Sequence, residues 1–249
     1  MGLRKIIKKT FYNLKFNKKN FYKLSNKTVL VTGASSGIGL GICKKLLETN
    51  TVIAIYNNNE KNLKKINNKN LIYVKCDLSN FNNFIELEDI IKKNEINIII
   101  NCAGQFGSDQ QAIKNINFEN FINIIKINSL SILKILQIID SNKKLKFLEK
   151  LLNISSDGGS IELNNEGGAY IYRTSKSALN SISKNLSIDL NKNCGISVLT
   201  LDPGNVKTNM NGKGYLDANK CAEYVIDILC DQENYNGVFM NTLKNKIPW

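Results

Sequence analysis

Two side chains that could exchange a proton with a substrate lie four positions apart, at Tyr172 and Lys176. On a helix this spacing places both side chains on the same face. A tyrosine phenol has a pKa of about 10, which is too high for acid–base work near neutral pH. An ammonium group one turn away stabilises the phenolate and lowers that pKa, so the spacing predicts an acid–base pair. The alternative is a solvated helix surface, where tyrosine and lysine at this spacing are common.

Two hydroxyl groups strengthen this hypothesis. Asn153-Ile-Ser-Ser156 ends the apolar run that precedes the tyrosine–lysine helix, so Ser155 and Ser156 fall at the carboxyl end of a predicted strand. The chain has no histidine. This excludes Ser-His-Asp and Cys-His catalysis and removes the commonest zinc ligand, and we predict no metal site.

A glycine-rich segment lies directly after the apolar run Thr28–Val31. Residues 32–39 read Thr-Gly-Ala-Ser-Ser-Gly-Ile-Gly, the pattern T-G-x-x-x-G-x-G between a strand and a helix. Glycine permits a tight turn with positive φ and lets a pyrophosphate approach the backbone at the helix N-terminus. A loop without a ligand is the alternative. The segment predicts a dinucleotide site that includes Gly33, Ser35, Ser36, Gly37, Ile38 and Gly39.

Two more turns follow predicted strands. Asp77, in Cys-Asp-Leu-Ser, is placed to accept a hydrogen bond from an adenine edge, and helix N-capping is an equal alternative. Asn101-Cys-Ala-Gly104 forms a second turn of small residues at a strand's carboxyl end, beside the predicted cofactor. We therefore add Asp77, Asn101, Ala103 and Gly104 to the predicted cofactor site.

The elements that position these residues alternate regularly from Thr28 onward. Near-continuous Val/Ile/Leu runs separated by helical patterns predict a single-domain Rossmann α/β fold, a doubly wound parallel sheet of about seven strands. The predicted strands are Thr28–Val31, Thr51–Ile55, Leu71–Lys75, Ile96–Ile100, Phe147–Ile154, Ile196–Leu201 and Gly237–Met240. The predicted helices are Gly37–Glu48, Phe81–Lys93, Phe118–Ile139, Tyr170–Leu190 and Asn219–Leu229.

From Thr28 to its end the chain resembles the short-chain dehydrogenase/reductase superfamily, and within it the branch of C-factor and Sniffer-like carbonyl reductases. The superfamily resemblance is carried by T-G-A-S-S-G-I-G, N-C-A-G, Asn128 in the long helix, N-I-S-S, Y-x-x-x-K and Asp202-Pro-Gly204. The branch resemblance rests on residues 155–180, 203–210 and the closing Gly-Val-Phe…Ile-Pro-Trp249. It implies an NAD(P)-dependent oxidoreductase that moves hydride between the nicotinamide and a carbonyl or alcohol.

The resemblance also implies a role for each matching residue. Tyr172 gives its proton to the substrate carbonyl, and Lys176 lowers the pKa of Tyr172 and bonds the nicotinamide ribose. Ser156, rather than Ser155, orients the carbonyl. Asn128 holds a water that connects Lys176 to solvent. Four residues after the sixth strand bind the nicotinamide end of the cofactor: Pro203, Gly204, Val206 and Thr208.

This chain departs from the family pattern at two positions. A third region bears on the choice between NAD and NADP. Cys102 replaces the usual second Asn, and Asn205 replaces an aromatic residue, which changes the substrate pocket. The end of the second strand, residues 55–58, carries neither an acid for the ribose 2′-hydroxyl of NAD nor a base for a 2′-phosphate. Because no acid opposes a 2′-phosphate and Lys61 or Lys64 could reach it, we favour NADP over NAD.

Residues 1–27 form a basic N-terminal arm before the predicted domain of residues 28–249. The arm holds nine Lys or Arg and no acid, so the rest of the chain carries only about +4 of the net charge of +13. Apolar residues at helical spacing give a basic amphipathic pattern, for which a solvated or oligomer-packing arm is favoured and a helix on an anionic membrane surface is the alternative. We predict no nucleic-acid binding, because basic character alone supplies no recognition module.

Composition and patterning bear on location and assembly. No uninterrupted apolar run reaches the length of a membrane span, and the N-terminus lacks a secretory signal. Six cysteines without a C-x-x-C pair suit a reducing compartment. We therefore expect a cytoplasmic protein, with peripheral contact at the inner membrane face through the arm. The resemblance implies a homo-dimer or homo-tetramer.

The function favoured by the sequence is a carbonyl reductase, or the same enzyme working in reverse. The alternative is a dinucleotide-binding regulatory or signalling protein of the C-factor type with little turnover. Intact Asn128, Ser156, Tyr172 and Lys176 favour the enzyme, since a pure binding protein need not keep an acid. A nucleotide-sugar epimerase or dehydratase is disfavoured, because those relatives have a differently spaced glycine turn.

Overall fold

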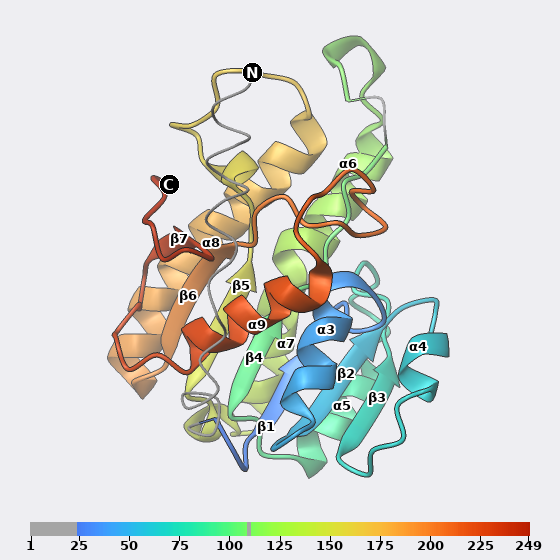
Figure 1. Ribbon diagram of the computed structural model, residues 1–249, viewed down its shortest axis with the longest axis vertical. Coiled ribbons are helices and arrows are strands. Elements are labelled where there is room, and N and C mark those ends of the chain that lie inside the picture. Colours follow the sequence, from blue (N-terminus) through green and yellow to red (C-terminus); the bar gives the residue numbers. More distant parts are fainter. Residues whose placement is uncertain (1–23, 109–110) are drawn as a thin grey trace.

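The computed structural model describes residues 24–108 and 111–249. In these residues seven parallel strands form one sheet in the order β3-β2-β1-β4-β5-β6-β7. Figure 1 shows the strands side by side across the molecule. The strand order reverses between β1 and β4, and Rossmann folds bind dinucleotides at such a reversal. The strands are β1 (Thr28–Val31), β2 (Thr51–Tyr56), β3 (Leu71–Lys75), β4 (Ile98–Asn101), β5 (Lys150–Ile154), β6 (Ser197–Asp202) and β7 (Phe239–Asn241).

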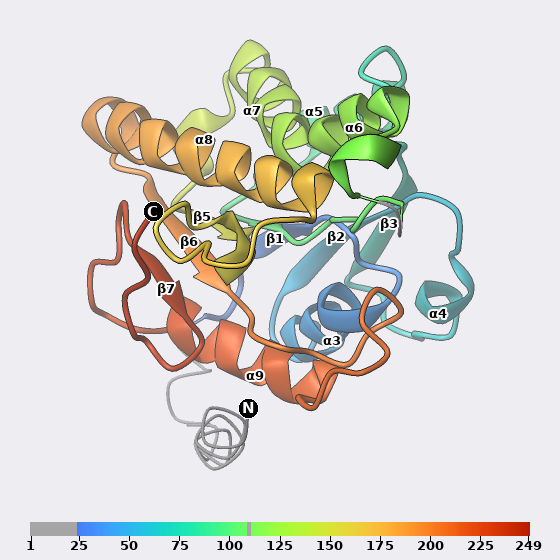
Figure 2. The same ribbon diagram turned by 90° about the horizontal axis from the view of Figure 1, so that it is seen from above.

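Helices cover both faces of the sheet, as Figure 2 shows from above. On one face lie α3 (Gly37–Leu46) and α9 (Ala218–Leu229). The other face carries α5 (Ile85–Lys93), α6 (Phe118–Ile125), α7 (Ser131–Ser141) and α8 (Tyr170–Cys194). The short α4 (Lys61–Lys64) lies beside β2 and β3. Three short 3₁₀ turns are η1 (Ile113–Asn115), η3 (Leu145–Phe147) and η4 (Asp157–Gly159).

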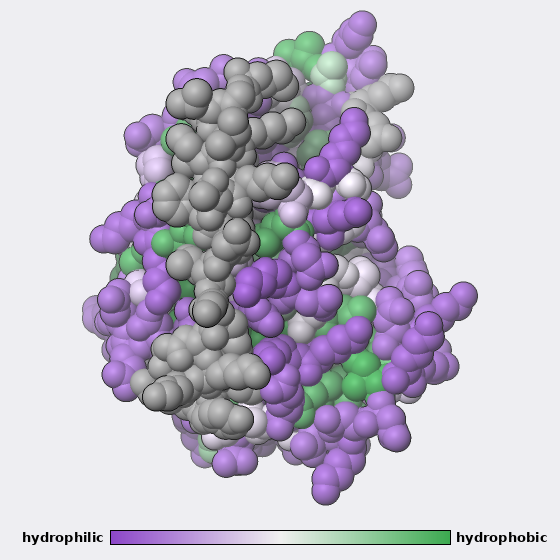
Figure 3. Space-filling view, viewed as in Figure 1, coloured by the Kyte–Doolittle hydropathy of each residue, from purple (hydrophilic) through white to green (hydrophobic). Residues whose placement is uncertain are grey.

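Alternation along the strands divides the hydrophobic core between the two faces. In β1, Val29 and Val31 pack with the residues of α3 and α9, whereas Leu30 packs with those of α5, α7 and α8. Successive strand residues point to opposite faces, so a sheet buried on both faces needs apolar residues at every position. This explains why the strands read as unbroken apolar runs. The face drawn in Figure 3 is correspondingly hydrophilic, with hydrophobic residues showing only in small patches between polar ones.

The predicted helix over residues 118–139 contains a π-helical turn. Its parts are α6, the turn η2 (Lys126–Leu130) and α7. Two hydroxyl groups bind backbone carbonyls at this turn, since Ser131 donates to the carbonyl of Ile127 and Ser129 donates to the carbonyl of Ser175 on α8. Such turns widen a helix by one residue and often mark functional sites.

The same 24-residue helix, Phe118–Ser141, is long and apolar enough to cross a membrane by length and composition. The sequence contains no uninterrupted apolar run of that length. Only the mean hydropathy, averaged over a window of the helix, is as high as in a membrane span. More than half of its apolar window, 56%, is buried inside the fold. Core helices of folded domains have the same composition, so the helix is explained by its packing on the sheet.

The domain begins slightly earlier than the sequence predicted. Residues 1–23 of the predicted arm lie outside the described residues, but Leu24 is buried in the core. The carbonyl of Leu24 accepts hydrogen bonds from Asn50 and Thr49, and Lys27 pairs with Glu149 at 2.6 Å. Residues 24–27 therefore belong to the folded domain rather than to an arm.

Candidate active site

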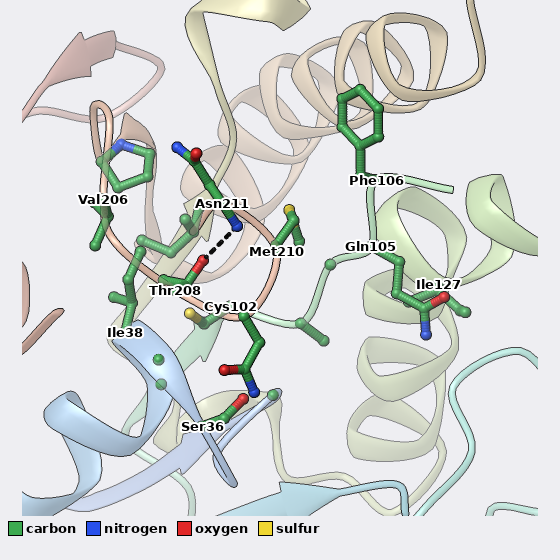
Figure 4. A pocket seen from close by; sticks show the side chains of 18 of the residues that line it. Ser36, Ile38, Cys102, Gln105, Phe106, Ile127, Val206, Thr208, Met210 and Asn211 are labelled. Atoms are coloured by element: carbon green, nitrogen blue, oxygen red, sulfur yellow. Dashed lines mark hydrogen bonds between the residues drawn. The ribbon is translucent and has the colours of Figure 1, made fainter. Parts of the chain in front are cut away.

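Most of the predicted site residues line one cavity of about 1120 Å³, and Asn101 and Asn128 are the exceptions. The cavity lies at the carboxyl ends of β1, β2, β4, β5 and β6, where parallel α/β sheets bind their ligands. Figure 4 shows side chains from the glycine turn, from the segment after β4 and from the loop after β6 converging on it. The predicted residues that line it are Gly33, Ser35, Ser36, Gly37, Ile38, Gly39, Asp77, Ala103, Gly104, Ser156, Tyr172, Lys176, Pro203, Gly204, Val206 and Thr208.

The glycine turn is packed too closely for any other residue. A Cβ on Gly33 would lie 2.8 Å from the Cα of Ala103, and the residue has a φ of +65°. A Cβ on Gly39 would lie 2.3 Å from the carbonyl oxygen of Gly33. Ser36 begins α3 without a side-chain cap, and the first turn of α3 carries no acid. Backbone N–H groups at a helix N-terminus are thus directed at the cavity, which suits a pyrophosphate.

A buried chain of polar side chains lies beneath this turn. Thr32 donates to Asn101 at 3.1 Å, Asn101 donates to Asn153 at 3.0 Å, and Asn153 donates to Ser183 at 2.9 Å. The hydroxyl of Thr32 also accepts from the backbone N–H groups of Cys102 and Ala103. The chain joins β1, β4, β5 and α8 behind the cavity wall.

These contacts correct the prediction for Asn101. Its side chain is 1% exposed and is not among those that line the cavity. Asn101 therefore holds neighbouring strands together rather than binding the cofactor with its side chain. The sequence analysis missed the parts played by Thr32, Asn153 and Ser183, because hydrogen bonds between strands leave no local sequence pattern.

Tyr172 and Lys176 both face the cavity, as their spacing predicts. The Nζ atom of Lys176 lies 6.0 Å from the centre of the Tyr172 ring and donates to the carbonyl of Ile154 at 2.9 Å. Lys176 is 4% exposed, and burial lowers its pKa to about 8. A lysine with this pKa changes charge close to physiological pH.

The pKa of Tyr172 is shifted in the direction opposite to the sequence expectation. Burial raises it to about 12, while a hydrogen bond from Ser156 acts in the lowering direction. The ammonium of Lys176 donates to the carbonyl of Ile154, and its Nζ atom lies 6.0 Å from the centre of the phenol ring. In this state of the protein Tyr172 is therefore a protonated phenol, the form that can donate a proton.

The two serines after β5 have different surroundings. Ser155 also lines the cavity, but it is 2% exposed and its hydroxyl is engaged as a donor to Asn180 on α8 at 2.6 Å. Ser156 accepts from the N–H of Gly158 at 3.1 Å and interacts with Tyr172. The role of Ser156, rather than Ser155, as the hydroxyl that orients a substrate carbonyl stays a prediction.

Asn128 lies in the π-helical turn behind the cavity and is fully buried. Its amide donates to the carbonyl of Gln105 and to the hydroxyl of Ser175, both at 2.9 Å, and its Oδ1 accepts from the N–H of Gln105 at 2.9 Å. Both side-chain N–H groups are thus used by the protein. The structure gives Asn128 a positioning role between the segment after β4 and α8, and its place in a water relay stays a prediction.

The charged residues after β2, near the predicted site of the adenosine ribose, differ from the sequence prediction. Lys64 is paired with Glu60, which also accepts from the hydroxyl of Tyr56 at 2.8 Å. Neither Lys61 nor Lys64 lines the cavity, so the prediction that one of them reaches a 2′-phosphate is not supported. The lining there includes residues 55–59, which carry no acid, together with Asp77 after β3.

Asp77, at the same end of the cavity, caps a local turn. Its Oδ1 accepts from both the N–H and the hydroxyl of Ser79, at 2.9 and 2.7 Å. The helix N-capping alternative is therefore wrong, because Asp77 closes a local turn and α5 begins only at Ile85 with Phe84 as its N-cap. Asp77 also lines the cavity, and its contact with an adenine stays a prediction.

The loop after β6 forms the roof of the cavity. Residues Val206 and Leu216 form a backbone bridge, and Lys207 donates to the carbonyl of Leu216 at 2.8 Å. Within the loop Thr208 accepts from the N–H of Asn211 at 3.2 Å, the contact drawn in Figure 4. The side chains of Asn205 and Asn211 bond each other at 2.6 Å, so the unusual Asn205 makes this wall polar. A Cβ on Gly37 would touch Thr208, which places the loop directly over the glycine turn.

Among the described residues, no group of three or more Cys, Asp or Glu is arranged to hold a metal ion. Cys102 lines the cavity, and burial raises its pKa to about 12, so it is a neutral thiol. The chemistry available in the cavity is thus that of a phenol, a hydroxyl and an amine beside a dinucleotide cradle.

A parallel Rossmann sheet, a closely packed glycine turn at a helix N-terminus and a tyrosine–lysine–serine group in one cavity define an NAD(P)-dependent oxidoreductase. The family model for short chain dehydrogenase matches residues 27–218. The chain belongs to this family.

Known proteins agree with this assignment. The chain is 31% identical over 206 residues to the 3-oxoacyl-(acyl-carrier-protein) reductase FabG of Rickettsia prowazekii, covering 76% of this chain and 77% of that protein. The carbonyl reductase Sniffer of D. melanogaster is 27% identical, with a TM-score of 0.80 over 90% of this chain and 100% of that one. An NADPH-bound carbonyl reductase from chicken fatty liver is also 27% identical, with a TM-score of 0.79 over the same shares.

A shorter match concerns a signalling protein. C-signal of Myxococcus xanthus is 35% identical over 106 residues, which is 41% of this chain and 62% of that protein. The likeness spans less than two thirds of that protein. The carbonyl reductase structures, in contrast, are matched over their whole length.

Proposed function

We propose that this protein is an NADPH-preferring carbonyl reductase in which Tyr172 donates the proton to the substrate oxygen. The observation that carries the proposal is the meeting of Ser156, Tyr172 and Lys176 in one cavity with the glycine cradle. When bound, the cofactor supplies the hydride. Ser156 donates to the substrate carbonyl and holds it against the phenol of Tyr172, which gives up its proton as negative charge develops on the carbonyl oxygen.

Lys176 supports this step in two ways. It lies on the same helix face as Tyr172, where its ammonium stabilises the phenolate that remains after proton transfer. Because burial brings its pKa to about 8, it can also pass a proton towards Tyr172 near neutral pH. A buried amine with this pKa is more useful for proton movement than a solvated one.

The preference for NADPH is supported by the lining of residues 55–59. None of these five residues carries a carboxylate that would repel a 2′-phosphate, and Glu60 is held by Tyr56 and Lys64. A carbonyl reductase of similar structure binds NADPH. The polar side chains of Asn57, Asn58 and Ser36 are available in the cavity to hydrogen-bond the phosphate.

The test is consumption of NADPH and of NADH with a panel of aldehydes, ketones and quinones. We expect turnover of at least one panel member, with a higher kcat/KM for NADPH than for NADH. Tyr172→Phe removes only the hydroxyl and should lower kcat by about 10²- to 10⁴-fold, while the Kd for NADPH stays unchanged. Equal inertness of wild type and variant, with intact cofactor binding, would instead favour the regulatory alternative of the C-factor type.

We further propose that the protein is a cytoplasmic homo-oligomer whose basic arm contacts anionic membranes. The nine cationic residues of segment 1–27 support the membrane part of this proposal. Co-sedimentation with vesicles of phosphatidylserine and phosphatidylcholine tests it, comparing the full chain with a chain that begins at Lys23 and keeps the buried Leu24. Equal sedimentation of the two chains would overturn the membrane contact.

A further inference from the structure

The side chain of Gln111 connects the segment after β4 to the helix that carries Tyr172. Gln111 is 5% exposed. Its Nε2 donates to the carbonyls of Phe106 and Ser108 at 2.8 and 3.0 Å, and its Oε1 accepts from the backbone N–H of Tyr172 at 3.0 Å. Both amide N–H groups and the amide oxygen are therefore engaged, which leaves this side chain one orientation.

Helix α8 needs such a partner at its N-terminus. Its N-cap is Ala169, which has a φ of 45° and offers no side-chain hydrogen bond. Tyr172 is the third residue of the helix, so its N–H has no acceptor within the helix. Serine, threonine or aspartate at the N-cap usually supplies that acceptor. Here Gln111 supplies it from 61 positions away in the sequence, and the N–H it fixes belongs to Tyr172 itself.

The other end of the Gln111 amide fixes a wall of the cavity. Phe106, whose carbonyl it binds, lines the cavity and packs on Tyr172 with ring centres 5.1 Å apart and planes tilted by 34°. Figure 4 shows the Phe106 ring on the side of the cavity opposite the glycine turn. One amide therefore holds both the backbone of the proton donor and the aromatic ring beside it.

We propose that Gln111 is a positioning residue for the reaction, setting the place of the Tyr172 phenol relative to Phe106 and the substrate carbonyl. The inference rests on the proposed role of Tyr172 as proton donor. Gln111 touches neither the cavity nor a reacting atom, and it acts through the contacts just described. Proton transfer is sensitive to small displacements, since a shift of about 1 Å can cost about 100-fold in rate.

Gln111→Met removes all three hydrogen bonds and keeps an unbranched side chain of similar length. The matched control is Gln137→Met, the same change at an exposed position of α7. The first measurement is hydrogen exchange at the Tyr172 amide, which needs no substrate. We expect exchange to be at least about fivefold faster in Gln111→Met and unchanged in Gln137→Met. An unchanged rate in Gln111→Met would overturn the proposal.

The second measurement is kinetic, with NADPH and the panel substrate that turns over fastest. We expect Gln111→Met to lower kcat by about 10- to 100-fold, with the Kd for NADPH within twofold of wild type. That Kd also verifies that the variant folds. A parallel loss of cofactor binding and kcat would show a merely structural role and overturn the proposal.

Gln111→Glu gives a signature that a structural role would not produce. It keeps an acceptor for the Tyr172 N–H, but its carboxylate faces the carbonyls of Phe106 and Ser108 and cannot donate to them. The protonated carboxyl group can donate to one of them. The kcat of this variant relative to wild type should therefore rise as pH falls, and a ratio independent of pH would contradict the inference.

The failure of this inference can be told from failure of the proposed function. If Tyr172→Phe is as active as wild type, the proposed proton donor is wrong. In that case amide exchange still reports whether Gln111 fixes α8. If Tyr172→Phe is inert and Gln111→Met has the kcat of wild type, only the role of Gln111 is wrong.

Discussion

Asn153→Ala interrupts the buried chain of polar side chains beneath the cavity. Asn153 is fully buried, and its Oδ1 accepts the N–H of Asn101 at 3.0 Å while its Nδ2 donates to Ser183 at 2.9 Å. Truncation leaves that N–H of Asn101 without an acceptor, which costs about 1–3 kcal/mol. Ser183 keeps its bond to the carbonyl of Leu179 and loses only one contact, worth about 1 kcal/mol. We therefore expect a loss of about 2–4 kcal/mol in the free energy of unfolding.

Urea denaturation followed by circular dichroism measures this loss. The matched control is Asn185→Ala, an exposed asparagine of α8, which should change the free energy of unfolding by less than about 0.5 kcal/mol. In the double variant with Asn101→Ala the orphaned N–H is also removed, so its cost should be smaller than the sum of the single costs. A loss below about 0.5 kcal/mol for Asn153→Ala, or strict additivity in the double variant, would refute this reasoning.

Three further perturbations test the cavity itself. Burial lowers the pKa of Lys176 from 10.5 to about 8, so the unfolded chain binds more protons than the folded protein between these two pH values. The free energy of unfolding should therefore rise with pH across that window. Lys176→Met should abolish this rise in denaturation curves measured from pH 8 to 10. Gly39→Ala places a Cβ within 2.3 Å of the Gly33 carbonyl and should weaken NADPH binding by more than about 100-fold in a fluorescence titration, and near-normal affinity would disprove the close packing. Ser156→Ala should lower kcat with little change in melting temperature, whereas Ser155→Ala should lower the melting temperature more than kcat; the reverse order would exchange the two assignments.

The strands were predictable because burial on both faces leaves a strong local signal. Thr28–Val31 and Leu71–Lys75 have the predicted bounds. Other boundaries differ from the prediction by a few residues. The helix predicted from Phe81 begins at Ile85, and the strand predicted from Phe147 begins at Lys150 after a 3₁₀ turn. Helix α4 was missed, because four residues are too few to show a period.

The site was predictable as far as residue type and strand ends determine it. Tyr172, Lys176 and Ser156 could be found because their chemistry is specific and a strand end or a helical spacing places them. The roles of Asn101 and Gln111 could not, since each depends on a partner 50 or more positions away. The charge of Lys64 was also misleading. Glu60 neutralises it, and the two side chains meet only because the helix brings residues four positions apart together.

The roof loop of residues 205–216 has a consequence for exchanging substrate preference between relatives. Its two ends meet at the Val206–Leu216 bridge, and most of its backbone hydrogen bonds close within the loop. A compact surface loop with adjacent ends behaves as a module. The loop can therefore be exchanged between relatives as one segment. The Asn205–Asn211 pair is then transferred intact, and the residues that transfer the proton remain those of the recipient protein. Replacing Asn205 or Asn211 alone would break the pair that the complete loop keeps.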